Sequence, residues 1–324
     1  VFRGDVILEM KDEAIALGAV HAGLSAGYSY PGTPASEIME YLIRLAGETK
    51  AFTAVWSVNE KVAYEEALGA SFAGKRALVS FKHVGLNVAA DPFMNSAVTG
   101  ANGGLLVVSA DDPGMHSSQN EQDSRYYVQF AQIFAYEPSD HQEAYDMARE
   151  AFDVSERFGL PVLMRMVTRL AHSRSPVQTR EPRGPNELRA GAARDWTLLP
   201  VNARRRFALL LDRQPEMVRF SEESPFNVLK LNESDRSLGV IASGVGYNYF
   251  REAMKGEAAL PSFLKVSTYP IPEGLIRKLV GHVDAVLVVE DGYPFIERQL
   301  RGLLGIAGKT VLGKLSGAIP ATGE

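Results

Sequence analysis

The sequence predicts an α/β protein with a doubly wound parallel sheet, followed by a smaller second α/β domain. Short β-like runs alternate with helical segments up to about residue 171, and the same alternation resumes on a smaller scale from about residue 236. Strands that alternate with helices are typical of a parallel sheet covered on both faces. The 324 residues are 46% hydrophobic and 23% charged, which fits a globular protein large enough for two domains.

The first domain is predicted to cover residues 1–171. Apolar runs bounded by turn residues predict its strands at Ala26–Tyr30, Phe52–Trp56, Arg76–Phe81, Gly104–Ser109 and Pro161–Val167. Segments rich in Ala, Leu, Glu and Met predict its helices at Asp12–Ala22, Pro34–Leu45, Val58–Phe72 and His141–Phe158.

Residues 172–235 are predicted to form a linker and a helical bridge. The periodicity stops after His172, and prolines and arginines become frequent up to about Arg206. We interpret Arg204–Arg206 as a solvated helix start rather than an anion site, and we expect the bridging helix at Phe207–Ser224.

The smaller domain is predicted at residues 236–324. Its expected strands are Leu238–Ser243, Phe263–Ser267, Ala285–Glu290 and Thr310–Leu312. Its expected helices are Asn248–Lys255, Glu273–Val280 and Phe295–Leu304.

Composition excludes several classes of protein and site. With 34 basic and 39 acidic side chains the net charge is -5, so neither nucleic acid nor an anionic membrane is an expected partner. No apolar run approaches the roughly 20 residues of a membrane span, and the first residues lack the apolar core of a signal peptide, which predicts a cytoplasmic protein. Cysteine is absent and the six histidines are scattered, so no metal or iron–sulfur site is expected from this chain alone.

Four polar or Gly/Pro-rich turns follow predicted strands. They are residues 30–34, 57–60, 82–87 and 111–125. Parallel sheets bind ligands at the carboxyl ends of their strands, so these turns are expected to converge on one edge. The chain has no phosphate-binding Gly-rich loop, no complete dinucleotide fingerprint and no Gly-x-Ser-x-Gly motif, which disfavours those chemistries.

The same turns carry a resemblance to a known family. The stretches Asp12–Ala19, Tyr30–Ile38, Trp56–Ala63, Lys82–Asp91, Asp111–Arg125 and Val288–Glu297 resemble the large (α) subunit of indolepyruvate:ferredoxin oxidoreductase. That subunit belongs to the thiamine-diphosphate-dependent 2-oxoacid:ferredoxin oxidoreductases, and the likeness covers its N-terminal half. It implies a pyrimidine-binding domain at 1–171 and a transketolase-C-terminal-like α/β domain at 236–324. The run Lys82–Asp91 resembles the indolepyruvate branch in particular.

The resemblance implies a catalytic role for Glu60. In the family a glutamate hydrogen-bonds N1′ of the cofactor pyrimidine, and a carboxylic acid there favours the tautomer whose 4′-nitrogen removes the proton from C2. From spacing alone, Ser57-x-x-Glu60 also has the form of a capping box, in which the glutamate only returns to the Ser57 amide.

Other site residues are implied in the same way. Thr33, Lys82, His83 and Arg125 are the candidates for the substrate carboxylate. Each of these residues also has a plain structural explanation. Thr33 could cap the helix that begins at Pro34, and Lys82 and His83 could be ordinary loop residues. Arg125 could form a salt bridge with Asp123 or Glu121. The residues implied to bind the cofactor are Tyr30, Pro31, Glu60, Gly85 and Asn87.

The expected function is that of an enzyme subunit. The resemblance implies oxidative decarboxylation of an aryl 2-oxoacid, of the indolepyruvate or phenylpyruvate type, to an acyl-CoA through a thiamine-diphosphate adduct. Electrons would pass to ferredoxin or another acceptor through partner chains. The family's Gly-Asp-Gly diphosphate motif and its cysteine cluster are not found here, so Mg²⁺, the diphosphate site and iron–sulfur clusters are expected in a partner, with coenzyme A as co-substrate. The alternatives are a non-oxidative decarboxylase or carboligase subunit, and a non-catalytic scaffold.

Overall fold

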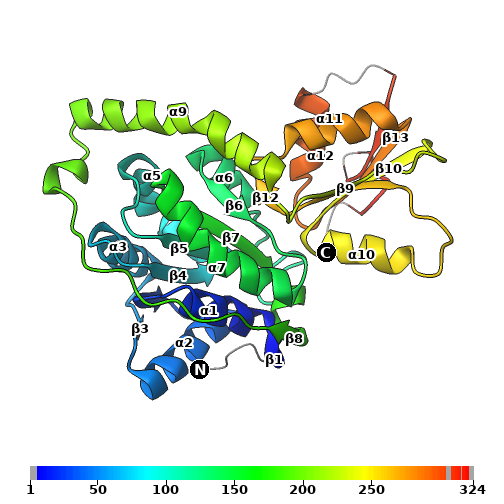
Figure 1. Ribbon diagram of the computed structural model, residues 1–324. Helices are drawn as coiled ribbons and strands as arrows, with labels where there is room; N and C mark the ends of the chain where they lie inside the picture. Colours follow the sequence, from blue (N-terminus) through cyan, green and yellow to red (C-terminus); the bar gives the residue numbers. More distant parts are fainter. Residues whose placement is uncertain (1–5, 304–307, 315, 321–324) are drawn as a thin grey trace.

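The computed structural model describes residues 6–303, 308–314 and 316–320 and contains two main sheets (Figure 1). A seven-stranded sheet has the order β12-β6-β7-β5-β4-β2-β3, and a five-stranded sheet has the order β14-β13-β10-β11-β9. Six strands of the larger sheet run parallel to one another: β2 (Ala26–Ser29), β3 (Thr53–Trp56), β4 (Ala77–Lys82), β5 (Leu105–Asp111), β6 (Phe134–Tyr136) and β7 (Val162–Val167). The predicted parallel α/β fold is therefore confirmed.

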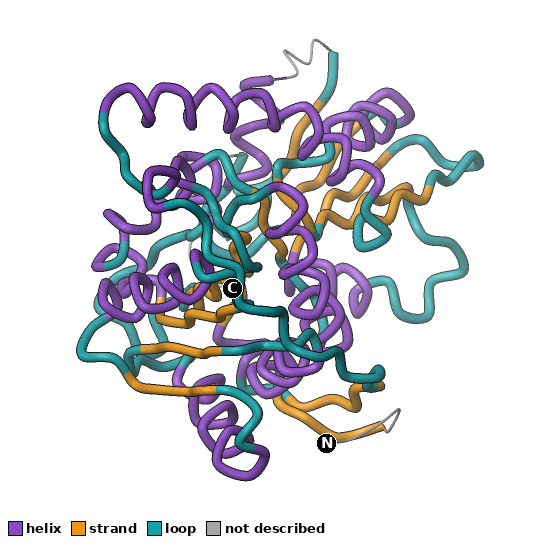
Figure 2. The backbone as a smooth tube through the Cα atoms, turned by 60° about the vertical axis from the view of Figure 1, so that its left-hand side comes forward, coloured by secondary structure: helices purple, strands orange, loops and turns teal. Residues whose placement is uncertain are grey.

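Helices cover both faces of the seven-stranded sheet, as Figure 2 also shows. One face packs against α1 (Lys11–His21), α2 (Ser36–Thr49) and α7 (His141–Phe158). The other face packs against α3 (Glu60–Phe72), α5 (Ala90–Thr99) and α6 (Arg125–Ala131). Neighbouring strand residues such as Leu78 and Val79 belong to opposite core clusters, because side chains alternate along a strand. Central strands buried on both faces explain the continuous apolar runs of the sequence.

Helix α7 illustrates how the sequence sets a boundary. The Asp140 side chain accepts a hydrogen bond from the Glu143 amide at 2.8 Å and caps the first turn. At the other end Gly159 adopts a left-handed conformation with φ 59°, which ends the helix. These are the bounds that the sequence predicts for this helix.

The region after β7 contains more regular structure than the sequence suggests. A short helix α8 (Thr168–Ala171) leads to β8 (Arg174–Gln178), which pairs antiparallel with β1 (Val6–Met10). After a 3-10 turn, η1 (Ala193–Asp195), helix α9 (Pro200–Glu223) runs along the top of Figure 1 toward the second sheet. The expected start of this helix at Phe207 is wrong, because Pro200 occupies the first helical position, where its missing N–H is not needed.

The five-stranded sheet is parallel except at one edge. Its parallel strands are β10 (Leu238–Ser243), β11 (Ser262–Val266), β13 (Ala285–Val289) and β14 (Thr310–Leu312), and β9 (Val228–Lys230) pairs antiparallel with β11. Its helices are α10 (Gly244–Ala253), α11 (Glu273–His282) and α12 (Phe295–Leu303). Between β11 and α11, β12 (Thr268–Tyr269) joins the other sheet by pairing antiparallel with β6, so the two sheets are connected by a shared segment.

Across the described residues, no helix combines the length and the hydrophobicity needed to cross a bilayer.

Candidate functional site

The turns after β2, β3, β4 and β5 converge at the carboxyl edge of the seven-stranded sheet. These strands are adjacent in the order β5-β4-β2-β3, and all are parallel. Ser117 in the turn after β5 forms hydrogen bonds both with the Thr33 carbonyl in the turn after β2 and with Lys82 at the end of β4. Gly85, in the short helix that follows β4, contacts Glu60, which follows the turn after β3. The predicted convergence is therefore confirmed.

Glu60 is the first residue of α3, and it does not form the capping box. The N-cap is Asn59, whose side chain accepts from the Val62 amide at 2.9 Å. The Ser57 hydroxyl donates instead to Glu66, at 2.5 Å. The purely structural explanation that spacing offers for Glu60 is thus wrong, because a different residue caps the helix.

The Glu60 side chain lies against Gly85 in α4 (His83–Val88). A Cβ atom at position 85 would stand 2.6 Å from Glu60 Cγ and 2.7 Å from Glu60 Oε1, closer than real Cβ contacts allow. Only glycine leaves room for the glutamate in this position. Within the described part of the chain, the half-buried Glu60 carboxylate has no hydrogen-bond or ion-pair partner. A carboxyl group held in place and left unpaired is available to a ligand.

Lys82 ends β4 and its side chain is buried beside the turn after β2. Its ammonium group donates to the Ser117 carbonyl at 2.8 Å, and Gly32 lies against the start of its side chain. Burial lowers the pKa of Lys82, and the negative charge of Asp112 offsets part of that effect. Lys82 is therefore a buried amine bonded to a polar turn rather than a solvated loop lysine.

His83 is 1% exposed at the start of α4, so it is not a plain loop residue. Its Nε2 lies 3.1 Å from the Asn120 carbonyl, which makes Nε2 the protonated nitrogen, because a carbonyl only accepts. Nδ1 is buried and has no partner among the described residues. An unpaired buried acceptor next to Lys82 is a second polar group that a ligand could satisfy.

Thr33 and its neighbours line an open depression. The exposed residues Tyr30, Pro31 and Thr33 form the turn after β2. The depression, of about 420 Å³, is lined by Thr33, His116, Ser117, Thr168, Arg169 and His172. Thr33 does not cap α2, whose first residue is Ser36 and whose N-cap is Ala35.

Asn87 lies two residues beyond Gly85 in α4 and is exposed. Its side-chain oxygen accepts a hydrogen bond from Tyr127 in α6 at 2.6 Å. Its amide group remains on the surface of the same short helix that holds Gly85.

Arg125 is not brought together with Glu60, Lys82 and His83. It is 1% exposed, and its guanidinium group donates to Asp123 at 2.5–3.1 Å, to Glu290 at 2.9 Å and to two backbone carbonyls, of Asp291 and Tyr293. Its donors are used up within the protein, so the geometry gives Arg125 a role other than the one the sequence suggests. The structure contains the salt bridge to Asp123 that the sequence suggests as the alternative role of Arg125.

Arg125 belongs to a buried group of charges between the two sheets, which we call the junction network. Arg165 on β7 bonds Asp111 at 2.7 Å, Asp291 at 2.9 Å, and Glu137. Burial opposes the charge of both arginines, but the surrounding carboxylates raise their pKa values well above the ordinary range. The members of the network are Arg125, Arg165, Asp111, Asp123, Glu137, Glu290 and Asp291.

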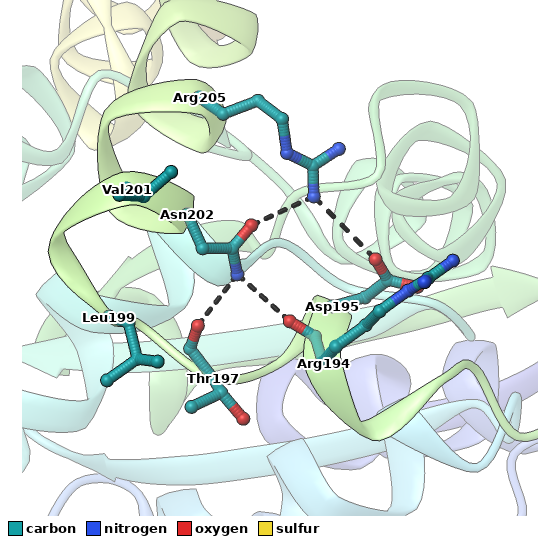
Figure 3. A pocket seen from close by; sticks show the side chains of 7 residues that line it. All are labelled: Arg194, Asp195, Thr197, Leu199, Val201, Asn202 and Arg205. Atoms are coloured by element: carbon teal, nitrogen blue, oxygen red, sulfur yellow. Dashed lines mark hydrogen bonds and ion pairs between the residues drawn. The ribbon is translucent and has the colours of Figure 1, made fainter.

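A larger pocket, of about 640 Å³, lies at the start of α9 and away from these turns (Figure 3). Its polar side chains are bonded within the pocket: Asn202 donates to the backbone carbonyls of Arg194 and Thr197, and Arg205 donates to the Asn202 side chain. These bonds hold the first turn of α9 against η1. The pocket contains none of the residues that the sequence predicts for the site.

Among the residues that the structure describes, no group of three His, Cys, Asp or Glu could hold a metal ion.

Comparison with known proteins agrees with this geometry. Residues 17–193 match the family described as pyruvate flavodoxin/ferredoxin oxidoreductase, thiamine diphosphate-binding. The chain is 41% identical to indolepyruvate oxidoreductase subunit IorA of Archaeoglobus fulgidus, with 99% of this chain and 52% of the relative aligned. Identity to the subunit of the same name in Methanothermobacter thermautotrophicus is 40%, over 98% and 52%. The resemblance seen in the sequence is confirmed, and the chain spans about half the length of these relatives.

Solved structures support the fold alone. A 2-oxoglutarate:ferredoxin oxidoreductase from Magnetococcus marinus, described with 2-oxoglutarate, coenzyme A and succinyl-CoA bound, superposes with a TM-score of 0.76 at 16% identity, covering 95% of this chain and 62% of that one. A split gene transketolase, described as an inactive beta4 tetramer, gives a TM-score of 0.61 at 13% identity, covering 94% and 87%.

Proposed function

Because this chain belongs to the thiamine-diphosphate-binding family of pyruvate flavodoxin/ferredoxin oxidoreductases, we propose that it provides the pyrimidine-binding half of a 2-oxoacid oxidoreductase site. The substrate we propose is an aryl 2-oxoacid, as in the name of the indolepyruvate oxidoreductase relatives. The observation that carries the proposal is the Glu60 carboxyl group, which is held against Gly85 and left unpaired at the edge where four turns meet.

The residues present fit thiamine diphosphate. A ring nitrogen of the pyrimidine needs a hydrogen-bond donor, and a protonated Glu60 carboxyl provides one without giving up a bond within the protein. Gly85, the exposed turn of Tyr30 and Pro31, and Asn87 would line the same place. When bound, thiamine diphosphate supplies a carbon nucleophile for the 2-oxo group of the substrate.

Each residue then has a definite task. Glu60 holds a proton at N1′ of the pyrimidine. Lys82 binds the substrate carboxylate as a cation, and the hydroxyl of Thr33, in the exposed turn after β2, is proposed to donate to the same carboxylate. His83, with Nε2–H directed to Asn120, presents Nδ1 as an acceptor.

The rest of the enzyme is proposed to lie outside this chain, which covers 52% of the length of these two relatives. We propose that a further domain or partner chain supplies the diphosphate site with Mg²⁺. Iron–sulfur clusters in partner chains would carry electrons to ferredoxin or another acceptor, and coenzyme A would accept the acyl group.

The proposal is tested by substrate preference in the assembled enzyme. We expect kcat/KM for indolepyruvate or phenylpyruvate to exceed that for pyruvate and 2-oxoglutarate by at least tenfold, the scale on which an apolar pocket discriminates. A higher kcat/KM for pyruvate or 2-oxoglutarate would refute the aryl substrate. Aldehyde release without reduction of any acceptor would point instead to a non-oxidative decarboxylase.

A further inference from the structure

Asp112, the first residue after β5, organises the loop that contacts Lys82. Its Oδ2 accepts from the Ser117 amide at 2.8 Å and from the Ser118 hydroxyl at 2.5 Å, and its Oδ1 accepts from Thr168 at 2.6 Å. Asp112 is fully buried, although Ser117 in the same loop is exposed. One carboxylate thus fixes the loop after β5 to the helix that follows β7.

The loop held by Asp112 places the groups that contact the predicted site. The Ser117 carbonyl accepts from the Lys82 ammonium at 2.8 Å, and the Ser117 hydroxyl lies 3.4 Å from both the Lys82 ammonium and the Thr33 carbonyl. Because the Ser117 amide is bonded to Asp112, the position of this carbonyl depends on Asp112. The chain of contacts runs from Asp112 through Ser117 to Lys82 and Thr33.

Asp112 and Lys82 are also linked by an electrostatic interaction. Burial opposes the ionisation of Asp112, but the hydrogen bonds from Ser118, Thr168 and the loop amides outweigh it and lower the pKa of Asp112 to about 2. Asp112 is therefore negative at neutral pH, and its charge raises the pKa of Lys82 against the lowering effect of burial. The other titratable side chains on the surrounding elements are Tyr30, His83, Asp111, His116, Glu121, Arg169 and His172, and the Glu121 carboxylate accepts from the Gly114 amide.

The side chain of the adjacent residue, Asp111, points away from the loop over Lys82 and toward the junction network. It bonds Arg165 and the Ser124 amide within the junction network. Successive side chains along an extended chain alternate in direction, so Asp111, the last residue of β5, directs its carboxylate to the junction between the sheets, and Asp112 directs its carboxylate to the loop over Lys82.

We propose that Asp112 is a positioning residue of the 2-oxoacid site, which fixes the loop at 113–118 so that Ser117 holds the Lys82 ammonium in place, and whose negative charge acts on that ammonium. Asp112 itself does not touch the substrate. The part that concerns substrate binding rests on the function proposed above, whereas the link from Asp112 to Lys82 does not.

The link is tested by the pH dependence with which acetic anhydride labels Lys82 in the full-length protein, followed by mass spectrometry of the Lys82 peptide. Only the uncharged amine reacts. In Asp112→Asn the midpoint for Lys82 is expected to fall by about one pH unit, since an opposite charge has been removed. Glu121→Gln removes a charge from the same loop and is the matched control, with an expected shift of less than about 0.3 unit. An unchanged midpoint in Asp112→Asn would overturn the link.

The positioning role is tested by the kinetics of the assembled enzyme. Asp112→Asn is expected to raise KM for the 2-oxoacid about tenfold, with kcat changed less than KM and the alkaline limb of kcat/KM moved to lower pH. A loss of kcat alone, with KM and the alkaline limb unchanged, would mean a merely structural role and would overturn the proposal.

Milder variants keep the test valid if Asp112→Asn does not fold. Ser118→Ala and Thr168→Val each remove one hydrogen bond to Asp112 and leave its charge, so KM is expected to rise by about threefold or more while the labelling midpoint of Lys82 stays in place. An unchanged KM in both variants would contradict the positioning role. Lys82→Met tests the underlying function separately: if it leaves KM for the 2-oxoacid unchanged, Lys82 does not bind substrate, whatever the labelling experiment shows.

Discussion

Gly85 determines where the Glu60 side chain can lie. The backbone of Gly85 has an ordinary helical conformation, so the position needs glycine for space and not for a positive φ. Glu60 is the flexible partner in this contact, since its Cγ and Oε1 are the atoms that an added Cβ would meet. A methyl group at position 85 would therefore move the glutamate more readily than it would disturb the helix.

This arrangement predicts the effect of Gly85→Ala. We expect turnover of the assembled enzyme to fall at least about tenfold, because a displacement of Glu60 on the order of an ångström is costly for a catalytic group, while Tm changes little. Gly69→Ala is the matched control. Gly69 also lies inside a helix, and nothing stands within 4 Å of an added Cβ, so activity should persist and stability should rise by about 0.5–1 kcal/mol. Full activity in Gly85→Ala would contradict the fitted position of Glu60.

At the level of elements, α1 and α7 are joined by a buried histidine. His21, in the last turn of α1, is fully buried, and its Nδ1 lies 2.8 Å from the Tyr145 hydroxyl of α7. Burial lowers the pKa of His21 to about 4, and the nearby charge of Arg149 adds to this effect. His21 is therefore neutral in the folded protein at pH 7.

The depressed pKa of His21 predicts a loss of stability in mild acid. The unfolded chain binds a proton at His21 near pH 6.5, whereas the folded protein binds it only near pH 4. As the pH falls from about 6.5 to 4, the free energy of unfolding should decrease by up to about 3 kcal/mol, with no further loss from this group below pH 4. Urea unfolding at several pH values, compared with His21→Gln, measures this contribution. Equal pH dependence in both proteins would contradict it.

The elements that sequence patterns predicted well are those whose signal is local. The strands β2, β4, β5 and β10 are apolar runs between turn residues, and α7 has an acidic N-cap and a glycine at its end. Short edge strands such as β9 and β12 carry no such pattern, because only their pairing with β11 and β6 makes them strands. The sequence predicts a linker for the N-terminal part of α9, because the first turns of this helix, around Arg204–Arg206, show little apolar periodicity.

In the candidate site, too, the features with a local sequence signal were predictable and those that depend on distant contacts were not. The four turns were predictable because each follows a strand directly, and strand order then brings them together. The sequence suggests Arg125 for the substrate site because a carboxylate is well bound by an arginine, but the partners of Arg125, Glu290 and Asp291, lie about 165 residues further along the chain. The sequence does not indicate the role of Asp112, because nothing in it distinguishes Asp112 from the neighbouring Asp111. Their roles differ only because the two side chains point in opposite directions in the structure.

At the scale of the whole molecule, the junction network connects the two sheets. It places five carboxylates and two guanidinium groups in a buried region, where the arginines bond residues from both sides. Buried charges are tolerated only when they are paired, so the removal of one cation leaves carboxylates that cannot be solvated. We infer that this network fixes the second sheet relative to the edge that carries Glu60 and Lys82.

Arg125→Met tests the role of the network. The substitution keeps a similar volume but leaves Asp123 and Glu290 without their cation, so the free energy of unfolding is expected to fall by about 3–5 kcal/mol. Arg157→Met is the control, because Arg157 forms an exposed ion pair with Glu216 and its loss should cost less than about 1 kcal/mol. Chemical denaturation of both variants makes the comparison. Equal stabilities would contradict the structural role of the network.

The central claim, that Glu60 serves the cofactor rather than the helix, is tested most directly by exchange of the C2 proton of thiamine diphosphate in the assembled enzyme. Glu60→Gln keeps the shape of the side chain but removes the acid, and Asn59 still caps α3. We expect C2 proton exchange to slow by at least roughly a hundredfold while Tm moves little, as for the loss of an acid–base group. Exchange at the wild-type rate with Gln at position 60 would contradict the account.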